Sequence, residues 1–240
     1  ERVKMLHACK GMRYQNRRKA RAFTLNVFEG NLADLRKICS LIEDPRNGLR
    51  LMHASMDSGN NSAHMEALRH FHNFLAAAKS LVDQTRTFVD EYYAGTAIQN
   101  AYEQKVQSEF SQDPLAKFVQ ELRNYMLHRN LPASSMTINL DGIENSIAKS
   151  MTTSVTINKQ GIEEWKGWTK LSRQYLQQAD EKIPISSISN PYGKKVLDFY
   201  CWFDLKLEKF HQVEIEELRR LQKEYSLTDE REKEMRAGAE

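Results

Sequence analysis

Three residues that could move a proton beside a phosphate lie near the middle of the chain, at Arg123, Asn124 and His128. Histidine titrates near neutral pH, so His128 can take up and release a proton during a reaction. Arginine stays charged, and its planar guanidinium matches phosphate oxygens, so Arg123 can stabilise negative charge there. Asn124 precedes His128 by four residues, which places both on one side of a helix. The amide could then orient the imidazole or contact the phosphate.

The element that must position these residues is predicted to be one amphipathic helix over residues 118–132. Asp113 is a suitable N-cap, Pro114 suits the first turn, and Pro132 ends the helix. Apolar residues recur at helical spacing on one side: Leu115, Phe118, Val119, Leu122, Tyr125 and Met126. Polar residues occupy the other side: Lys117, Gln120, Glu121, Asn124 and His128, with Arg123 at the edge. The helix therefore offers a core on one side and a basic surface on the other.

The pattern Arg123-Asn124-x-x-x-His128 resembles the Arg-x(4–6)-His signature of the HEPN superfamily (higher eukaryotes and prokaryotes nucleotide-binding). In that family Asn, Asp or His often follows the arginine, and the motif lies on a late helix of a compact helical bundle. The sequence Leu-Arg-Asn-Tyr-x-x-His, followed soon by Leu-Pro, is also similar to the motif of many prokaryotic members. The resemblance covers about residues 62–132 and the later helices.

Two other places in the chain match the same spacing, so the spacing alone is weak evidence. Arg2-x4-His7 lies in the basic N-terminal region, and Arg46-Asn47-x5-His53 includes the asparagine. Only the third match lies on a well-formed amphipathic helix with an apolar residue between the arginine and the histidine.

The resemblance implies a metal-independent endoribonuclease that works as a homodimer with a composite active site and no cofactor. RNA supplies its own nucleophile, the ribose 2′-OH, so such a site needs only proton transfer and charge stabilisation. We expect these roles on the helix: catalysis by Arg123, Asn124 and His128, substrate binding by Arg129, Lys117 and Gln120, and dimer contact by Leu127. The family also implies a toxin or phage-defence role in the cytoplasm, with RNA and an antitoxin or defence-system protein as partners.

Each of these side chains also has a plainer interpretation. His128 near a helix C-terminus can simply offset the helix dipole. Arg123 can pair with a surface carboxylate, and an exposed Leu127 is common in itself. The alternative function is a non-catalytic helical dimerisation or binding module that holds a protein or nucleotide partner.

The chain as a whole is predicted to be mainly α, a HEPN-like helical bundle with a small inserted antiparallel β-hairpin. Further helices are expected over these ranges: 31–43, 45–56, 62–93, 97–110, 161–179 and 191–225. Strands are expected at 134–140 and 151–157, with Asp141 beginning their connection, and residues 21–28 fit a short strand or a helix end. We divide the chain into a basic helical extension (1–61), the bundle (62–225, hairpin at about 134–157) and a polar tail (226–240).

Composition adds few constraints on function. The net charge of the 240 residues is only +3, so overall charge does not indicate a nucleic-acid-binding protein. A basic run from Lys10 to Arg21 contains no acid; it could contact phosphates or form a solvated arm. Three widely spaced cysteines predict free thiols in a reducing cytosol rather than a disulfide framework or metal site: Cys9, Cys39 and Cys201. No apolar run approaches the length of a membrane span, so no membrane association is expected.

Overall fold

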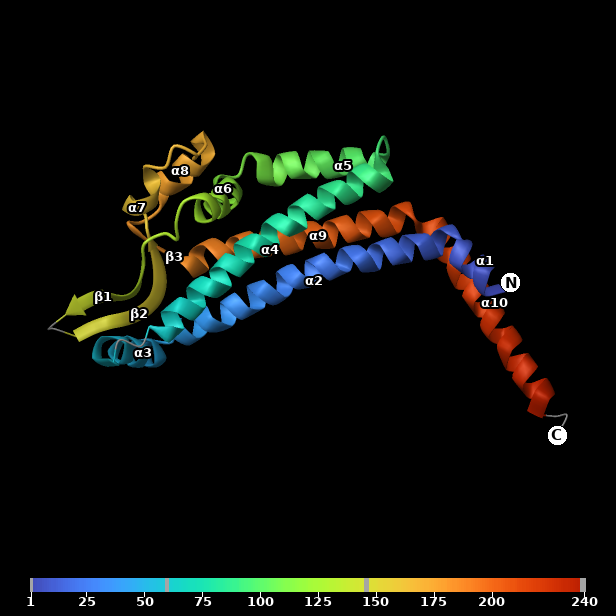
Figure 1. Cartoon of the computed structure of the whole chain (residues 1–240), viewed down its shortest axis with the longest axis horizontal. Helices are drawn as coiled ribbons and strands as arrows, with labels where there is room; N and C mark the ends of the chain where they lie inside the picture. The colour runs from blue at the N-terminus through green and yellow to red at the C-terminus, as the bar shows by residue number, and fades with distance from the viewer. Residues whose placement is uncertain (1, 59–60, 145–146, 238–240) are drawn as a thin grey trace.

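The computed structural model describes residues 2–58, 61–144 and 147–237 and is mainly helical, with a small antiparallel sheet at one end (Figure 1). The predicted fold class, mainly α with a small β insertion, is confirmed. The helices are α1 (Arg2–Ala8), α2 (Lys10–Glu43), α3 (Pro45–Ser58), α4 (Ser62–Tyr93), α5 (Ala97–Val106), the π-helical turn η1 (Gln107–Ser111), α6 (Pro114–His128), α7 (Gln160–Glu163), α8 (Lys170–Gln178), α9 (Ile185–Phe210) and α10 (Gln212–Ala237). The strands are β1 (Ser134–Glu144), β2 (Ile147–Asn158) and β3 (Lys182–Pro184).

Three long helices, α2, α4 and α9, pack along one another and form the body of the molecule (Figure 1). Phe28 of α2 packs on Phe74 of α4 with ring centroids 5.6 Å apart, and Tyr192 of α9 meets Phe74 edge-on at 6.1 Å. All three side chains are buried. The boundary expected after residue 61 therefore falls between two helices that share one core.

Helix α2 is the largest difference from the sequence prediction. It begins at Lys10, not at Asn31, and residues 21–28 lie in its interior rather than in a strand. Asn31 does not cap a helix; its side-chain amide donates to the Val27 carbonyl 2.8 Å away, inside α2. The apolar pattern is interrupted because two of the buried positions facing the other helices are polar, Arg21 and Thr24.

The β-hairpin is confirmed, but it is longer than predicted. Ser134 pairs with Ile157 and Leu140 with Met151, in the antiparallel register that the alternating pattern suggests. Asp141 does not begin the connection, because it pairs with Ser150 and β1 continues to Glu144. A third strand, β3, pairs with β2 inside the region expected to be a connector.

Two of the predicted later helices are interrupted. The helix expected over 161–179 is two helices, because the segment between α7 and α8 leaves helical geometry so that Trp168 can pack on α6. Its indole Nε1 donates to the Ile162 carbonyl at 2.6 Å.

The helix expected over 191–225 begins earlier, at Ile185, contains Pro191, and breaks at His211. Helix α10 then continues to Ala237, so the segment 226–237 of the expected polar tail has a helical backbone. No helix in the part of the chain that the structure describes is long and apolar enough to cross a membrane.

Candidate functional site

Helix α6 begins as the local sequence predicts, but it ends at His128, so Pro132 does not end it as expected. Pro114 occupies the first turn, and the Asp113 carboxylate accepts a hydrogen bond from the Ala116 amide at 2.8 Å. This bond satisfies one of the free N–H groups at the helix start. The cap therefore fixes where the helix begins and hence which residues face solvent.

The buried side of α6 is held by aromatic packing. Phe118 stacks on Tyr175 of α8 at 4.5 Å and on Trp168 at 5.2 Å. Tyr125 meets Trp165 edge-on at 5.5 Å. Because these large rings fill the space around α6, the helix cannot rotate about its axis without opening the core. Its polar side is therefore presented in one orientation.

A cavity of about 270 Å³ lies between α4 and the polar side of α6. Four of the predicted site residues line it: Lys117, Gln120, Arg123 and Asn124. On the opposite wall α4 contributes Lys79, Asp83 and Arg86. The structure thus brings together most of the polar side of α6 and adds a second wall that the motif did not reveal.

Arg123 is partly buried in this cavity and incompletely paired. Its Nη1 donates to Oδ1 of Asn124 at 3.5 Å, and its Nε is buried with no hydrogen-bond acceptor among the residues that the structure describes. A buried donor without an acceptor costs about 1–3 kcal/mol. An incoming anion would remove that cost, so the side chain is suited to receive a negatively charged group.

Positive charge dominates the cavity wall. On α4, Asp83 forms an ion pair with Arg86 at 2.9 Å and a second ion pair with Lys79. The other acid, Glu121, accepts a hydrogen bond from the Thr169 amide at 2.9 Å, at the start of α8. Each acid is therefore already engaged, while the Nε of Arg123 lacks a partner.

His128, Leu127 and Arg129 do not line this cavity. His128 is exposed, and within the described ranges its side chain makes no hydrogen bond or ion pair. Leu127 is 46% exposed, and Arg129 forms the C-cap of α6, where its amide donates to the Tyr125 carbonyl at 2.9 Å. Five residues of helix separate Arg123 from His128 by about 7.5 Å along the axis. A single chain therefore presents the arginine and the histidine at different places on one surface.

The motif did not identify Lys79 and Arg86, but the sequence carried a signal for them. Lys79, Asp83 and Arg86 are spaced four and three residues apart, so they share one side of α4. What the sequence could not show is that this side of α4 faces the polar side of α6.

The described residues contain no group of three or more His, Cys, Asp and Glu side chains arranged to hold a metal ion. The metal-free chemistry expected from the motif stays a prediction. The three cysteines are free thiols, with Cys39 buried and Cys201 exposed.

No protein-family model, characterised protein or solved structure matches the chain. The HEPN resemblance therefore stays a prediction from the sequence of α6.

Proposed function

We propose that this chain is a metal-independent endoribonuclease of the HEPN type that acts as a homodimer. The observation that carries the proposal is the polar side of α6. There Arg123 and Asn124 line a basic cavity, while His128, one turn after Asn124, is exposed and its side chain has no partner among the described residues. A second copy of the chain could complete the site.

The chemistry assigns one task to each side chain. The imidazole of His128 takes the proton from the ribose 2′-OH, and the resulting oxygen attacks the neighbouring phosphorus. The bond from phosphorus to the 5′ oxygen breaks, and this oxygen takes up a proton from the solvent, to which the imidazolium later returns the proton it accepted. Arg123 stabilises the charge that develops on the phosphate oxygens. The products are a cyclic 2′,3′-phosphate and a 5′-hydroxyl, so no metal or cofactor is consumed or required.

The dimer contact is assigned to Leu127, which lies between Arg123 and His128 and leaves much of its apolar side chain exposed. Burying such a side chain against its symmetry mate contributes about 1.5–3 kcal/mol. A contact at this position brings two copies of Arg123 and two of His128 to one groove. Lys117, Gln120 and Arg129 are assigned to the RNA strand around it.

The biological setting is proposed from the same resemblance. A ribonuclease of this type acts on cytoplasmic RNA as a toxin or in phage defence, with an antitoxin or another defence-system protein as partner. These assignments depend on the proposed ribonuclease activity, and a chain without that activity would support none of them.

The experiment is incubation of the purified chain with total RNA in EDTA. We expect the wild type to cleave RNA and His128→Ala to be inactive with an unchanged circular dichroism spectrum. His53→Ala is the matched control, because His53 is also an exposed helical histidine and belongs to the competing Arg46 motif on α3. No cleavage by the wild type, or full cleavage by His128→Ala, would overturn the proposal.

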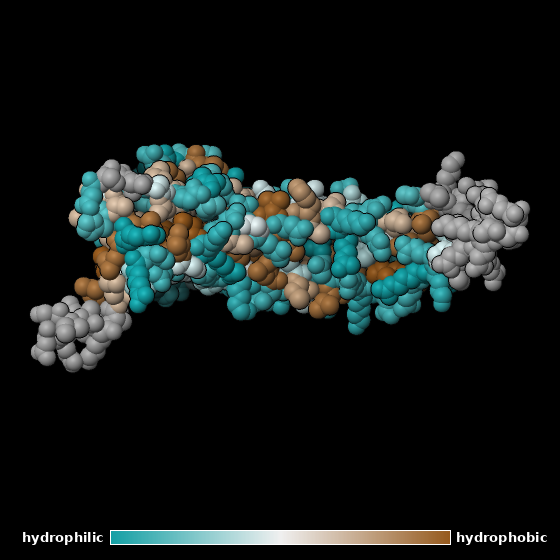
Figure 2. All heavy atoms as spheres, turned by 90° about the horizontal axis from the view of Figure 1, so that it is seen from below, coloured by the Kyte–Doolittle hydropathy of each residue, from teal (hydrophilic) through white to brown (hydrophobic). Residues whose placement is uncertain are grey.

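The second function is a non-catalytic helical module that holds a protein or nucleotide partner. Exposed apolar side chains away from α6 favour it, since Phe23 of α2 is 71% exposed and Leu205 of α9 is 63% exposed. On the face seen in Figure 2, apolar side chains form separate patches among hydrophilic ones. This module predicts no RNA hydrolysis, and the same incubation decides between the two.

A further inference from the structure

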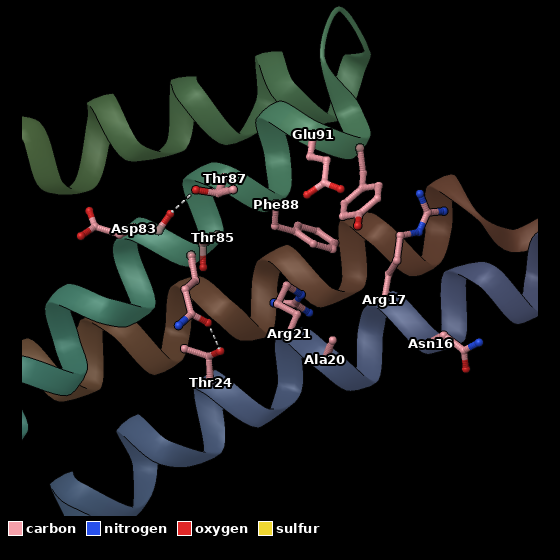
Figure 3. A pocket seen from close by; sticks show the side chains of 12 residues that line it. Asn16, Arg17, Ala20, Arg21, Thr24, Asp83, Thr85, Thr87, Phe88 and Glu91 are labelled. Atoms are coloured by element: carbon pink, nitrogen blue, oxygen red, sulfur yellow. Dashed lines mark hydrogen bonds between the residues drawn. The ribbon is translucent and has the colours of Figure 1, made fainter.

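A larger cavity, about 510 Å³, lies between α2 and α4, and the proposed ribonuclease chemistry does not use it (Figure 3). Pockets that bind small molecules are typically about 300–1,000 Å³. The size of this cavity is therefore that of a small-molecule site. Its lining differs from the basic cavity on α6 because two arginines of α2 meet aromatic rings here.

Arg21 is the central polar residue of this cavity. Its side chain is only 4% exposed and extends from α2 into the space between the helices (Figure 3). The ring of Phe88 lies 5.7 Å from the guanidinium carbon and that of Phe203 lies 5.2 Å from it. Burial lowers the pKa of Arg21 from its ordinary value.

The guanidinium of Arg21 is only partly satisfied. Nη2 forms an ion pair with Asp204 of α9, whereas Nε and Nη1 are buried with no acceptor in the described part of the chain. Most buried polar atoms in proteins have a hydrogen-bond partner, so such atoms call for an explanation.

Arg17 repeats this feature one turn earlier on α2. Its guanidinium carbon lies 4.8 Å from the centre of the Tyr92 ring, and its Nε is buried without an acceptor within the described ranges. Arg17 and Arg21 are four residues apart, so both face the cavity from the same side of the helix. Two adjacent arginines thus offer unpaired donors to one space.

Several other polar groups of the lining already have partners. Thr24 donates to Gln84, and the Thr85 hydroxyl donates to the Leu81 carbonyl at 2.8 Å. Asp83 pairs with two cations of α4, and Glu91 is hydrogen-bonded to Tyr92. The buried polar atoms of the lining that lack a partner among the described residues are therefore arginine donors, which an anion can satisfy.

We propose that this cavity binds a small organic anion, a carboxylate or phosphate carried on one flat apolar ring. The anionic group binds Arg21 and Arg17, and the ring packs against Phe88 and the exposed edge formed by Ala20. The site is independent of the ribonuclease proposal, because neither arginine belongs to α6.

The test is titration calorimetry of the full chain with three probes that share a phenyl ring. Phenyl phosphate and phenylacetate carry the two anionic groups, and phenylacetamide is their neutral counterpart. We expect at least one anion to bind about tenfold or more tightly than the amide, the size of one charge-assisted hydrogen bond. The stronger anion identifies the kind of ligand.

Two variants locate the binding without removing the buried arginine, whose loss could unfold the chain. Ala20→Trp fills the cavity edge from an exposed position, and Arg17→Gln removes the outer charge. Both should lose anion binding by about tenfold or more. Ala33→Trp, at an exposed position of α2 outside this cavity, should bind like the wild type.

Three results would overturn the proposal. The first is no heat of binding from either anion at millimolar concentration. The second is equal affinity for the amide, which would mean that the arginine donors are not used. The third is undiminished binding by folded Ala20→Trp, which would place the probe elsewhere on the surface.

Discussion

Nη1 of Arg123 donates to Oδ1 of Asn124 at 3.5 Å, inside the cavity between α4 and α6. A hydrogen bond of that length is weak, so a better acceptor can displace it. If the acceptor is an RNA phosphate, Arg123→Ala should lower kcat/KM by about 10²- to 10³-fold, the usual effect of losing one charge-stabilising donor. The kcat/KM of Arg123→Lys should lie between those of the wild type and Arg123→Ala, since lysine keeps the charge but not the planar donors.

Cleavage of a fluorescently labelled RNA in EDTA measures these values. Arg46→Ala is the matched control, because Arg46 is exposed on α3 and also precedes an asparagine. An Arg123→Ala enzyme as active as the Arg46→Ala enzyme would remove Arg123 from the active site.

Leu127 gives a prediction about assembly. Leu127→Glu should shift a dimer to the monomer, because a charge placed opposite its own copy repels it and must lose water. Sedimentation velocity measures the oligomeric state. Leu205→Glu, at the more exposed apolar position on α9, should leave the dimer intact. The reverse outcome, with Leu205→Glu dissociating the dimer, would support the binding-module function.

His211 links stability to pH at the junction of α9 and α10. Its Nε2 lies 2.9 Å from the Tyr93 hydroxyl, and its ring stacks on Tyr14 at 4.2 Å. Burial lowers the pKa of His211, with a smaller contribution from Arg17, while Glu214 opposes the shift. The unfolded chain, with a histidine pKa of about 6.5, therefore binds this proton more readily than the folded chain.

Stability should therefore be highest above the unfolded-state pKa and fall as pH drops through it toward the lowered folded-state value. Urea unfolding at about pH 7.5 and about pH 5.5 measures the loss. In His211→Phe, which keeps the stack on Tyr14, the loss between the two pH values should be smaller. Burial also lowers the pKa of His64, so this histidine contributes to the loss of stability in the same direction. The loss measured in His64→Gln therefore shows how large that second contribution is. An unchanged loss in His211→Phe would contradict the assignment.

Two glycines of α2 give opposite predictions for the same change. A Cβ on Gly11 would overlap the backbone oxygen of Glu214 and lie 2.7 Å from the Leu218 Cβ, so Gly11→Ala pushes α10 away. We expect a loss of about 1–3 kcal/mol in the free energy of unfolding. A Cβ on Gly30 meets nothing within 4 Å, so Gly30→Ala should stabilise by about 0.5–1 kcal/mol. Thermal unfolding of both variants checks the pair, and equal effects would show that α10 does not pack here.

The sequence predicted elements whose signals are local. Asp113 and Pro114 mark the start of α6 through a cap and a fixed backbone angle, and both act within one turn. Alternation alone predicted the hairpin. By contrast, the start of α2 was missed because Arg21 is buried by helices distant in sequence, and no local pattern makes an arginine a core residue.

Strand β3 was missed because it has only three residues and exists through its pairing with β2. The candidate site likewise contains residues that local sequence predicts and residues that depend on tertiary packing. The residues of α6 that share a face follow from helical periodicity, but the opposing Lys79 and Arg86 depend on how α4 packs against α6.

In the proposed ribonuclease two chains form one site, and each chain alone is incomplete. Mixing Arg123→Ala and His128→Ala proteins, allowing subunits to exchange, and measuring RNA cleavage in EDTA tests this arrangement. We predict that each variant alone cleaves at least about 10²-fold more slowly than the wild type and that the mixture regains part of the wild-type rate, because a mixed dimer retains one Arg123 and one His128. A mixture no more active than its separate components, although both variants dimerise, would contradict the composite site.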